Sequence, residues 1–171
     1  MGICYSCYLN SKLKNLDNDV PLFDLKGKIY SAKVVDVYDG DTCTIVLYLN
    51  NNFTKFKLRC LGYDSPEMKP PKDIKDRDKL INMAIKSRNY FISRVTNCLI
   101  DIDKHYTKKE LKELIDTNTK LIKVKSHGWD KYGRFLGEIF IKNQNLNQEM
   151  VNKNYGYEYD GGTKKVFSVD I

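Results

Sequence analysis

Residues 29–61 read IYSAKVVDVYDGDTCTIVLYLNNNFTKFKLRCL and contain three strand-like runs in close succession. The runs 29–37 and 42–49 are rich in β-branched residues, and in the run 53–61 apolar side chains alternate with Lys or Arg. Alternation with a period of two predicts strands that pack on one face. Because Asn tolerates a positive φ, the Asn triplet at 50–52 predicts a hairpin turn. We therefore expect a three-stranded meander that curls into a small barrel.

The sequence after this meander turns helical and then returns to strands. Apolar residues between 76 and 96 recur at three- and four-residue steps, which predicts an amphipathic helix. Thr107 and Glu110 have the spacing of a capping box and predict a short helix, in a segment that we interpret as an insertion. Two further strands are expected at 121–125 and 135–141.

Weaker local signals complete the predicted elements. The segment Leu99–Ile102 has the composition of a short strand. Asn147 is expected to cap a last helix, with Leu146 and Val151 as a hydrophobic staple. Asn154 is placed to end that helix in a left-handed conformation. The total is five strands and three helices, an α+β chain built on a five-stranded barrel.

Length and composition favour a single domain with an N-terminal extension. The 171 residues, 42% of them hydrophobic, are enough for one packed core and exclude global disorder. Residues 1–27 show no clear periodicity, so we interpret them as a leader outside the core and residues 28–171 as the domain. No apolar run approaches the roughly 18 residues of a membrane span, and no secretory signal peptide is evident. Five cysteines are an odd number, which argues against a disulfide framework and favours a reducing compartment.

The formal net charge is +7, and Lys and Arg concentrate in residues 68–88 and 104–125. A basic domain attracts polyanions such as nucleic acid, an anionic membrane or phosphorylated ligands. The alternative is an ordinary solvated surface rich in lysine, and charge alone does not distinguish the two.

Four short motifs carry candidate chemistry. One is the tail Tyr155-Gly156-Tyr157-Glu158-Tyr159, for which packing against the barrel is the plain alternative. Asp39-Gly40-Asp41-Thr42 lies between the first two strands, where Asp-Gly alone would indicate only a turn. Residues 59–67, RCLGYDSPE, place an arginine ahead of two carboxylates. Residues 130–134, DKYGR, precede the fifth strand, where a turn with a solvated arginine is the plain alternative.

Phosphodiester hydrolysis requires the residue types that these motifs supply. A hard divalent cation needs oxygen ligands, which Asp41 and Asp64 provide. Glu67 can act as the general base on water. Arg59 and Arg134 suit the charge that develops on the phosphoryl oxygens. We expect the base and both arginines to face outward from the barrel.

Other residues with possible metal or base contacts have simpler explanations. His105 and His127 are isolated and lack the spacing of zinc ligands, so we interpret both as surface or structural residues. Trp129 is interpreted as a packing residue rather than a base-stacking one.

Taken in order, the motifs D-G-D-T, R-x-x-x-x-D-S-P-E, D-K-Y-G-R and N-x-x-M-V resemble those of the staphylococcal nuclease (thermonuclease) family. The resemblance runs from about Ile29 to Gly156. It implies a five-stranded OB-fold barrel with three helices. It also implies calcium-dependent cleavage of DNA and RNA at the 5′-oxygen–phosphorus bond, leaving 3′-phosphate ends.

The resemblance further implies a role for each matching residue. Asp41 and Asp64 match the calcium carboxylates, Ser65 a backbone carbonyl ligand, and Asp39 an acid near the calcium but outside its ligands. The remaining implied roles are these: general base, Glu67; phosphate binding, Arg59 and Arg134; contact with a terminal phosphate, Lys131 and Tyr132; contact with a base, Tyr157 and Tyr159.

The N-terminus carries a pattern for lipid attachment. Gly2 and Ser6 fit M-G-x-x-x-[ST], the pattern for N-myristoylation, and Cys4 and Cys7 are candidate S-palmitoylation sites. One myristoyl chain binds membrane only marginally, so a second lipid is needed for lasting anchorage. Two alternatives are a C-x-x-C redox or zinc pair and an unmodified start.

The leading hypothesis is therefore a calcium-dependent nuclease held on a membrane, at the cytoplasmic face of the plasma membrane or at another membrane. Without acylation the chain would be soluble. A second hypothesis is a non-catalytic module of the same fold that binds nucleic acid or protein. A third is a membrane scaffold in which the barrel is incidental.

Overall fold

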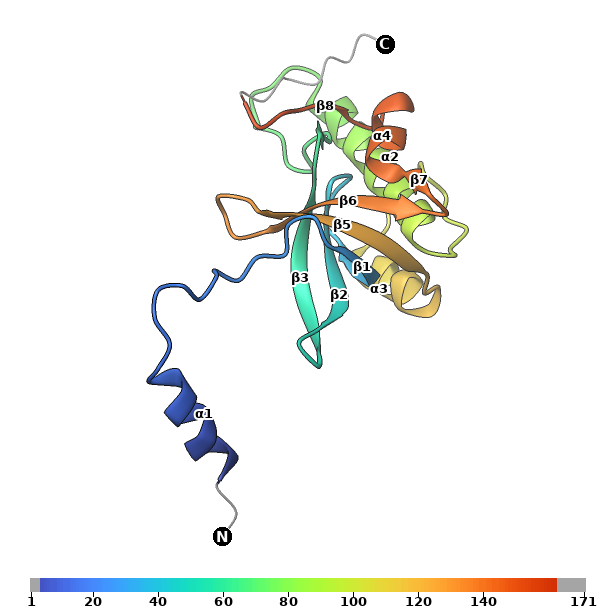
Figure 1. Cartoon of the computed structure of the whole chain (residues 1–171). Coiled ribbons are helices and arrows are strands. Elements are labelled where there is room, and N and C mark those ends of the chain that lie inside the picture. Colours follow the sequence, from blue (N-terminus) through green and yellow to red (C-terminus); the bar gives the residue numbers. More distant parts are fainter. Residues whose placement is uncertain (1–3, 163–171) are drawn as a thin grey trace.

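Five long strands close into a barrel in the computed structural model, which describes residues 4–162 (Figure 1). The strands are β1 (Ile29–Val37), β2 (Thr42–Leu49), β3 (Asn52–Cys60), β5 (Leu121–Trp129) and β6 (Phe135–Ile141). Antiparallel neighbours follow the order β3-β2-β1-β5-β6, and a parallel pairing of β3 with β6 closes the barrel. The predicted α+β fold with a five-stranded barrel is confirmed.

Buried apolar side chains of the strands fill the barrel interior. Ile45, Leu58, Val124 and Phe135 come from four strands and are all 0% exposed. Burying each such side chain is worth about 1.5–3 kcal/mol relative to leaving it exposed. Trp129 packs on Phe135 with ring centroids 5.9 Å apart, in agreement with its interpretation as a packing residue.

The turn between β2 and β3 forms as the Asn triplet predicts. Asn50 and Asn51 have φ angles of 49° and 63°, and Leu49 pairs directly with Asn52. Two consecutive positive φ angles are typical of the turn whose twist matches that of a hairpin.

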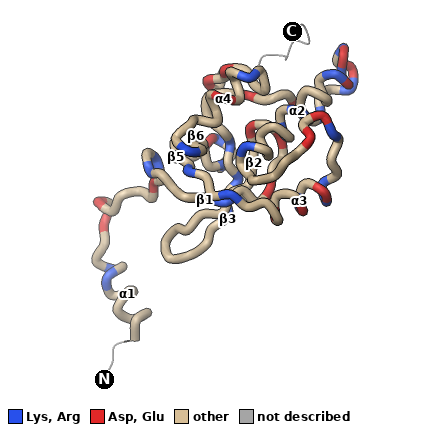
Figure 2. Tube along the Cα trace, turned by 90° about the vertical axis from the view of Figure 1, so that its right-hand side faces the viewer, with Lys and Arg blue, Asp and Glu red and all other residues tan. Residues whose placement is uncertain are grey.

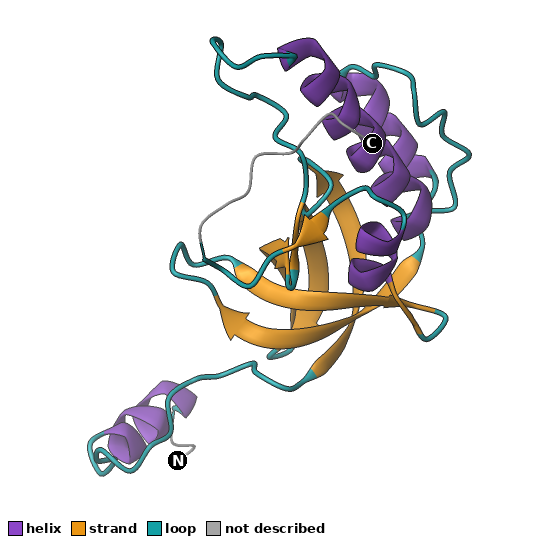
Figure 3. Cartoon of the chain, turned by 90° about the horizontal axis from the view of Figure 1, so that it is seen from above, coloured by secondary structure: helices purple, strands orange, loops and turns teal. Residues whose placement is uncertain are grey.

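Three helices gather on one side of the barrel (Figure 3). They are α2 (Arg77–Val95), α3 (Lys108–Thr117) and α4 (Leu146–Asn152). The predicted capping box is present in α3, where the Thr107 side chain accepts from Glu110 and the Glu110 side chain accepts from the Thr107 N–H. Asn154 has a φ of 60° just after α4, as predicted.

The predicted cap of α4 is wrong by two residues. Asn145 accepts from the Gln148 N–H and is the N-cap. Asn147 is buried instead, and its side-chain amide bonds to the backbone of the barrel. The amide oxygen accepts the Ile139 N–H, and the amide nitrogen donates to the carbonyls of Leu61 and Gly137.

The predicted strand at Leu99–Ile102 is absent, and Leu99 is fully exposed. The physical reason lies in helix α2, where the buried Asn89 amide donates to the carbonyls of Asp101, Ile102 and Lys104. Because these carbonyls accept hydrogen bonds from a side chain, they do not pair with a neighbouring strand.

Three very short strands were not predicted: β4 (Tyr63–Asp64), β7 (Gln144–Asn145) and β8 (Tyr157–Glu158). The antiparallel pair β4–β8 brings the C-terminal part of the described chain next to the RCLGYDSPE segment. This pairing bears directly on the site described below.

The N-terminal leader contains an unpredicted helix, α1 (Tyr5–Leu13), which buries no residue and lies apart from the barrel (Figure 1). The end of the leader differs from expectation, because Leu25 is 0% exposed within the core and Gly27 N–H donates to the Ser126 carbonyl. Thus the last residues of segment 1–27 pack with the barrel.

Charges of both signs are intermixed along the helices and the loop before α2 (Figure 2). Several lysines of the two basic segments pair with acids, among them Lys86 with Asp103 and Lys104 with Glu110. None of the helices in residues 4–162 has the length and apolar character needed to cross a bilayer.

Candidate active site

The loop between β1 and β2 is shaped by its first aspartate. The Asp39 Oδ1 accepts the N–H groups of Asp41 and Thr42, at 3.1 and 2.7 Å. Gly40 meets helix α2 so closely that a Cβ there would lie 1.9 Å from Ser87 Oγ. The Asp-Gly pair therefore does more than make a turn, since it lets the loop pass close to α2.

The second acidic residue stands on β4, across from this loop. Asp64 is 3% exposed and Asp41 is 5% exposed. The Ser65 N–H donates to Asp41 Oδ2 at 2.6 Å and so joins the two segments. The structure thus brings Asp41 of the D-G-D-T motif next to Asp64 and Ser65 of the D-S-P-E motif, although the two motifs are far apart in sequence.

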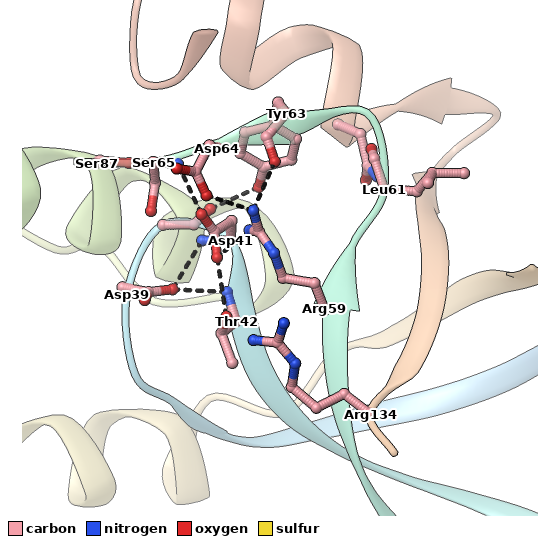
Figure 4. Close-up of polar contacts among 12 residues, drawn as sticks. Asp39, Asp41, Thr42, Arg59, Leu61, Tyr63, Asp64, Ser65, Ser87 and Arg134 are labelled. Atoms are coloured by element: carbon pink, nitrogen blue, oxygen red, sulfur yellow. Dashed lines mark hydrogen bonds and ion pairs between the residues drawn. The ribbon is translucent and has the colours of Figure 1, made fainter. Parts of the chain in front are cut away.

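Arg59 lies between these two carboxylates (Figure 4). Its guanidinium forms ion pairs with Asp41 Oδ1 and, at 2.5 Å, with Asp64 Oδ1. Burial alone would lower the pKa of Arg59, but the two negative charges raise it overall. Arg59 alternates with the core residues Leu58 and Cys60, so it leaves the barrel outward as expected. It is nevertheless only 8% exposed, because its guanidinium lies between the two aspartates, and this burial was not predicted.

The guanidinium marks a position for a cation between the two Oδ1 atoms. Within residues 4–162, no three His, Cys, Asp or Glu side chains are grouped as ligands for a metal. A hard cation such as calcium, however, also accepts carbonyl oxygens and water. The Ser65 Oγ is buried and has no hydrogen-bond partner in the described part of the chain. Two carboxylates that share a cation, with further oxygens alongside, fit the donor chemistry of calcium.

Asp39 is held near this position without contacting Arg59 in any described ion pair. Burial, and then the charge of Asp41, raise the pKa of Asp39 to about 7. The role outside the calcium ligands that the family resemblance implies for Asp39 stays a prediction.

The DKYGR motif forms a tight turn whose aspartate orients the arginine. Asp130 Oδ1 accepts the N–H groups of Tyr132 and Arg134, and Asp130 Oδ2 accepts from Arg134 Nε at 2.5 Å. Gly133 has a φ of 76°, which favours glycine at that position. The Arg134 guanidinium extends from this turn toward Arg59 (Figure 4).

A cleft of about 820 Å³ contains both arginines and both carboxylates. Its lining also includes the following sequence-predicted residues: Asp39, Ser65, Glu67, Lys131, Tyr132 and Tyr159. Glu67 is exposed and lines this cleft. Tyr38 and Lys57 line it too and were not predicted, since a single tyrosine or lysine in a strand carries no distinctive signal.

Residues 57–165 match the protein family described as staphylococcal nuclease homologue, which is well over half of the chain. The chain belongs to this family. It is also 33% identical over 132 residues to an uncharacterised protein of Methanocaldococcus jannaschii. That similarity covers 75% of this chain and 58% of the archaeal protein, so the chain spans little more than half of its relative's length.

In this staphylococcal nuclease homologue the two C-terminal tyrosines differ in position. The Tyr159 N–H donates to the Gly62 carbonyl, and its ring reaches the cleft. The Tyr157 hydroxyl donates to Asp64 Oδ2 at 3.0 Å, and its ring lines a neighbouring cavity of about 540 Å³. The family resemblance implies the same role for both tyrosines, whereas in the structure they line different spaces.

Two supporting residues of the nuclease homologue were missed. The Tyr63 hydroxyl donates to the Gly40 carbonyl at 2.5 Å, and Ser87 Oγ donates to the Tyr155 carbonyl at 2.7 Å. Both are buried, so they resemble ordinary core residues in the sequence. Only the contacts show that they hold the 39–42 loop and the C-terminal segment.

The candidate sites for lipid attachment lie near the N-terminus, far in sequence from the C-terminal tyrosines. Gly2 is outside the described residues. Cys4 and Cys7 are both exposed and unpaired, at the start of α1. The backbone N–H groups of Cys7 and Ser6 lower the pKa of Cys4.

Proposed function

We propose that this chain is a calcium-dependent endonuclease that hydrolyses phosphodiester bonds of DNA and RNA and leaves 3′-phosphate ends. One observation carries the proposal: two carboxylates turn their Oδ1 atoms to one buried cationic position, inside a cleft that also holds Glu67 and Arg134. Membership of the staphylococcal nuclease homologues supports the same reaction class.

Asp41 and Asp64 would hold the calcium ion, together with the Ser65 backbone carbonyl. Bound calcium would act as a Lewis acid that polarises the phosphodiester and neutralises developing charge. Without calcium, Arg59 neutralises the same two carboxylates, which would otherwise repel each other in a buried place.

The remaining steps belong to side chains of the cleft. Glu67 accepts a proton from the attacking water. Arg59 and Arg134 donate to the phosphoryl oxygens as negative charge increases on them, and the planar guanidinium suits two oxygens at once. The bond to the 5′-oxygen breaks, the leaving 5′-oxygen takes up a proton from water, and the phosphate stays on the 3′ side. Lys131, Tyr132 and Tyr159 border the cleft where the rest of the polynucleotide would lie.

The direct test is cleavage of plasmid DNA and of an RNA oligonucleotide by the purified full chain. We expect cleavage with Ca²⁺, loss of cleavage with a chelator, and weak cleavage with Mg²⁺, which demands tighter octahedral coordination. The Glu67→Gln variant should be at least about 100-fold slower and serves as the control for contaminating nucleases. Products should lose phosphate from their 3′ ends on treatment with phosphatase.

Two results would contradict this proposal in different ways. Full cleavage with Mg²⁺ alone would remove the calcium requirement. Tight nucleic-acid binding without cleavage would favour the non-catalytic module.

We further propose that the enzyme is anchored to a membrane, at the cytoplasmic face of the plasma membrane or at another membrane. The proposal rests on the N-myristoylation pattern at Gly2 and on S-palmitoylation at Cys4 or Cys7. The exposure of both cysteines and the lowered pKa of Cys4 support it, since the thiolate is the reactive form.

A further inference from the structure

The carboxylate of Asp64 has its two oxygens in different environments. Oδ1 faces the Arg59 guanidinium, at the position proposed for the cation. Oδ2 accepts the hydroxyl of Tyr157 at 3.0 Å. Asp64 and Tyr157 are also direct partners in the β4–β8 pairing, so the tyrosine is held opposite the aspartate by backbone as well as side chain.

Asp41 has a related arrangement. Its Oδ2 accepts the Ser65 N–H at 2.6 Å, and its Oδ1 faces Arg59 and also accepts the Thr42 hydroxyl at 2.8 Å. In both carboxylates a protein donor thus binds Oδ2, and Oδ1 is the oxygen that faces the shared cation. Hydrogen bonds to the second oxygen of a ligating carboxylate orient the first and tune its affinity for the metal.

The position of Tyr157 is fixed by contacts of the two residues that precede it. A Cβ on Gly156 would lie 2.6 Å from the Tyr63 ring, so β8 is pressed against β4 there. The preceding carbonyl, of Tyr155, accepts from Ser87 Oγ at 2.7 Å. The Tyr157 hydroxyl is therefore delivered to Asp64 by a segment that is anchored to both β4 and α2.

Tyr157 is not one of the residues that line the cleft with the arginines. It lines the adjoining cavity with Val151, whereas Tyr159 borders both spaces. Of the two tyrosines, only Tyr159 is thus placed at the cleft where a polynucleotide would lie.

We propose that Tyr157 is a positioning residue for Asp64. Its hydroxyl holds Oδ2 so that Oδ1 is presented to the divalent cation, and the C-terminal strand β8 thereby sets the affinity of the site for calcium. This inference rests on the calcium site of the proposed function.

The test is calcium binding by the full chain in the absence of nucleic acid, measured by isothermal titration calorimetry. Tyr157→Phe keeps the ring and removes the hydroxyl, and we expect its Kd for Ca²⁺ to rise about 10-fold or more. Tyr159→Phe is the matched control, because the Tyr159 hydroxyl donates to the Gly162 carbonyl and not to Asp64. Its Kd should equal that of the wild type. Thermal unfolding in chelator verifies that both variants fold.

The possible outcomes separate this inference from the proposed function. If the wild type binds calcium and Tyr157→Phe binds it equally well, the positioning role is wrong while the calcium site stands. If Tyr157→Phe is neutral but Tyr157→Ala raises KM for an oligonucleotide, Tyr157 contacts the substrate instead. If the wild type binds no calcium, the calcium site fails and this inference fails with it.

Discussion

At the scale of single residues, the site depends on side chains that are oriented by a second group. Asp130 holds the Nε of Arg134, Asp39 holds the N–H groups of its own loop, and Tyr157 holds Asp64. Arg59 is a special case, because it is buried between two carboxylates. Removing one partner of a buried ion pair typically costs about 3–5 kcal/mol. Substituting Arg59 would therefore lower stability as well as activity.

Arg134→Lys should reduce kcat at least about 100-fold, although the charge is kept. Lysine has no planar fork, so it cannot satisfy Asp130 and a phosphoryl group together. The measurement is the rate of oligonucleotide cleavage at saturating Ca²⁺. Lys104→Arg, which lies outside the cleft, is the control and should keep near-normal kcat. An equally active Arg134→Lys would mean that Arg134 acts as a simple point charge.

Gly40→Ala should destabilise the fold by about 1–3 kcal/mol, the usual cost of overpacking. Its Cβ would meet Ser87 Oγ at 1.9 Å and Ser65 Cβ at 2.9 Å. Chemical denaturation gives the free energy of unfolding. In a Ser87→Ala background the cost of Gly40→Ala should fall, because the closest atom is gone. If the losses of unfolding free energy of Gly40→Ala and Ser87→Ala simply add in the double variant, the two residues do not clash directly.

At the scale of elements, α2 and α4 are joined to the barrel by polar as well as apolar contacts. Asn147 on α4 bonds β6 and the residue after β3, and Asn89 on α2 organises the loop that follows it. The same two helices meet at Glu149, which pairs with Arg94 and accepts from Tyr90.

Asn147→Ala should cost about 2–3 kcal/mol of unfolding free energy, because the buried Ile139 N–H and the Leu61 carbonyl lose their Asn147 partner. Asn145→Ala, in the true cap, should cost about 1 kcal/mol. Denaturant titration of both variants makes the comparison. A larger loss of stability for Asn145→Ala than for Asn147→Ala would contradict the structural role assigned to Asn147.

Stability should depend on pH through Glu149. Burial alone would raise the pKa of Glu149, but the hydrogen bond from Tyr90 and the charge of Arg94 lower it. A lowered folded-state pKa adds stability above the unfolded value of about 4.3, and this stability is lost as pH falls through the folded value. Glu149→Gln should therefore be destabilising at pH 7 and less so near pH 3, as measured by denaturant unfolding. An effect that is equal at both pH values would contradict the pairing.

At the scale of the whole molecule, the leader and the cleft belong to separate parts of the chain. Helix α1 buries no residue, whereas the described barrel from Leu25 onward contains every residue of the proposed catalytic centre. A lipid on the leader would therefore leave the cleft intact.

Gly2→Ala should release the protein from membranes, and Cys4→Ser with Cys7→Ser should weaken retention while myristate is kept. Nuclease activity in solution should survive both changes. Fractionation of eukaryotic cells fed labelled fatty acids is the measurement. A wild-type protein that stays soluble and takes up neither label would exclude the anchor.

Local patterns were enough to predict the barrel strands, the hairpin at Asn50 and the capping box at Thr107. These features depend on interactions between residues that are close in sequence, so period, turn chemistry and spacing carry them. The motifs also identified the acidic and basic residues that now share one cleft.

Tertiary structure decided what those residues contact. Three of these contacts join segments from different strands or helices. They are the ion pairs of Arg59 with two aspartates, the hydrogen bonds of the Asn147 amide, and the hydrogen bond from Tyr157 to Asp64. A strand pattern shows which way Arg59 leaves the barrel but not that a loop and β4 close over it. The energies of these contacts depend on the partner and on the exclusion of water, and both arise only when the chain has folded.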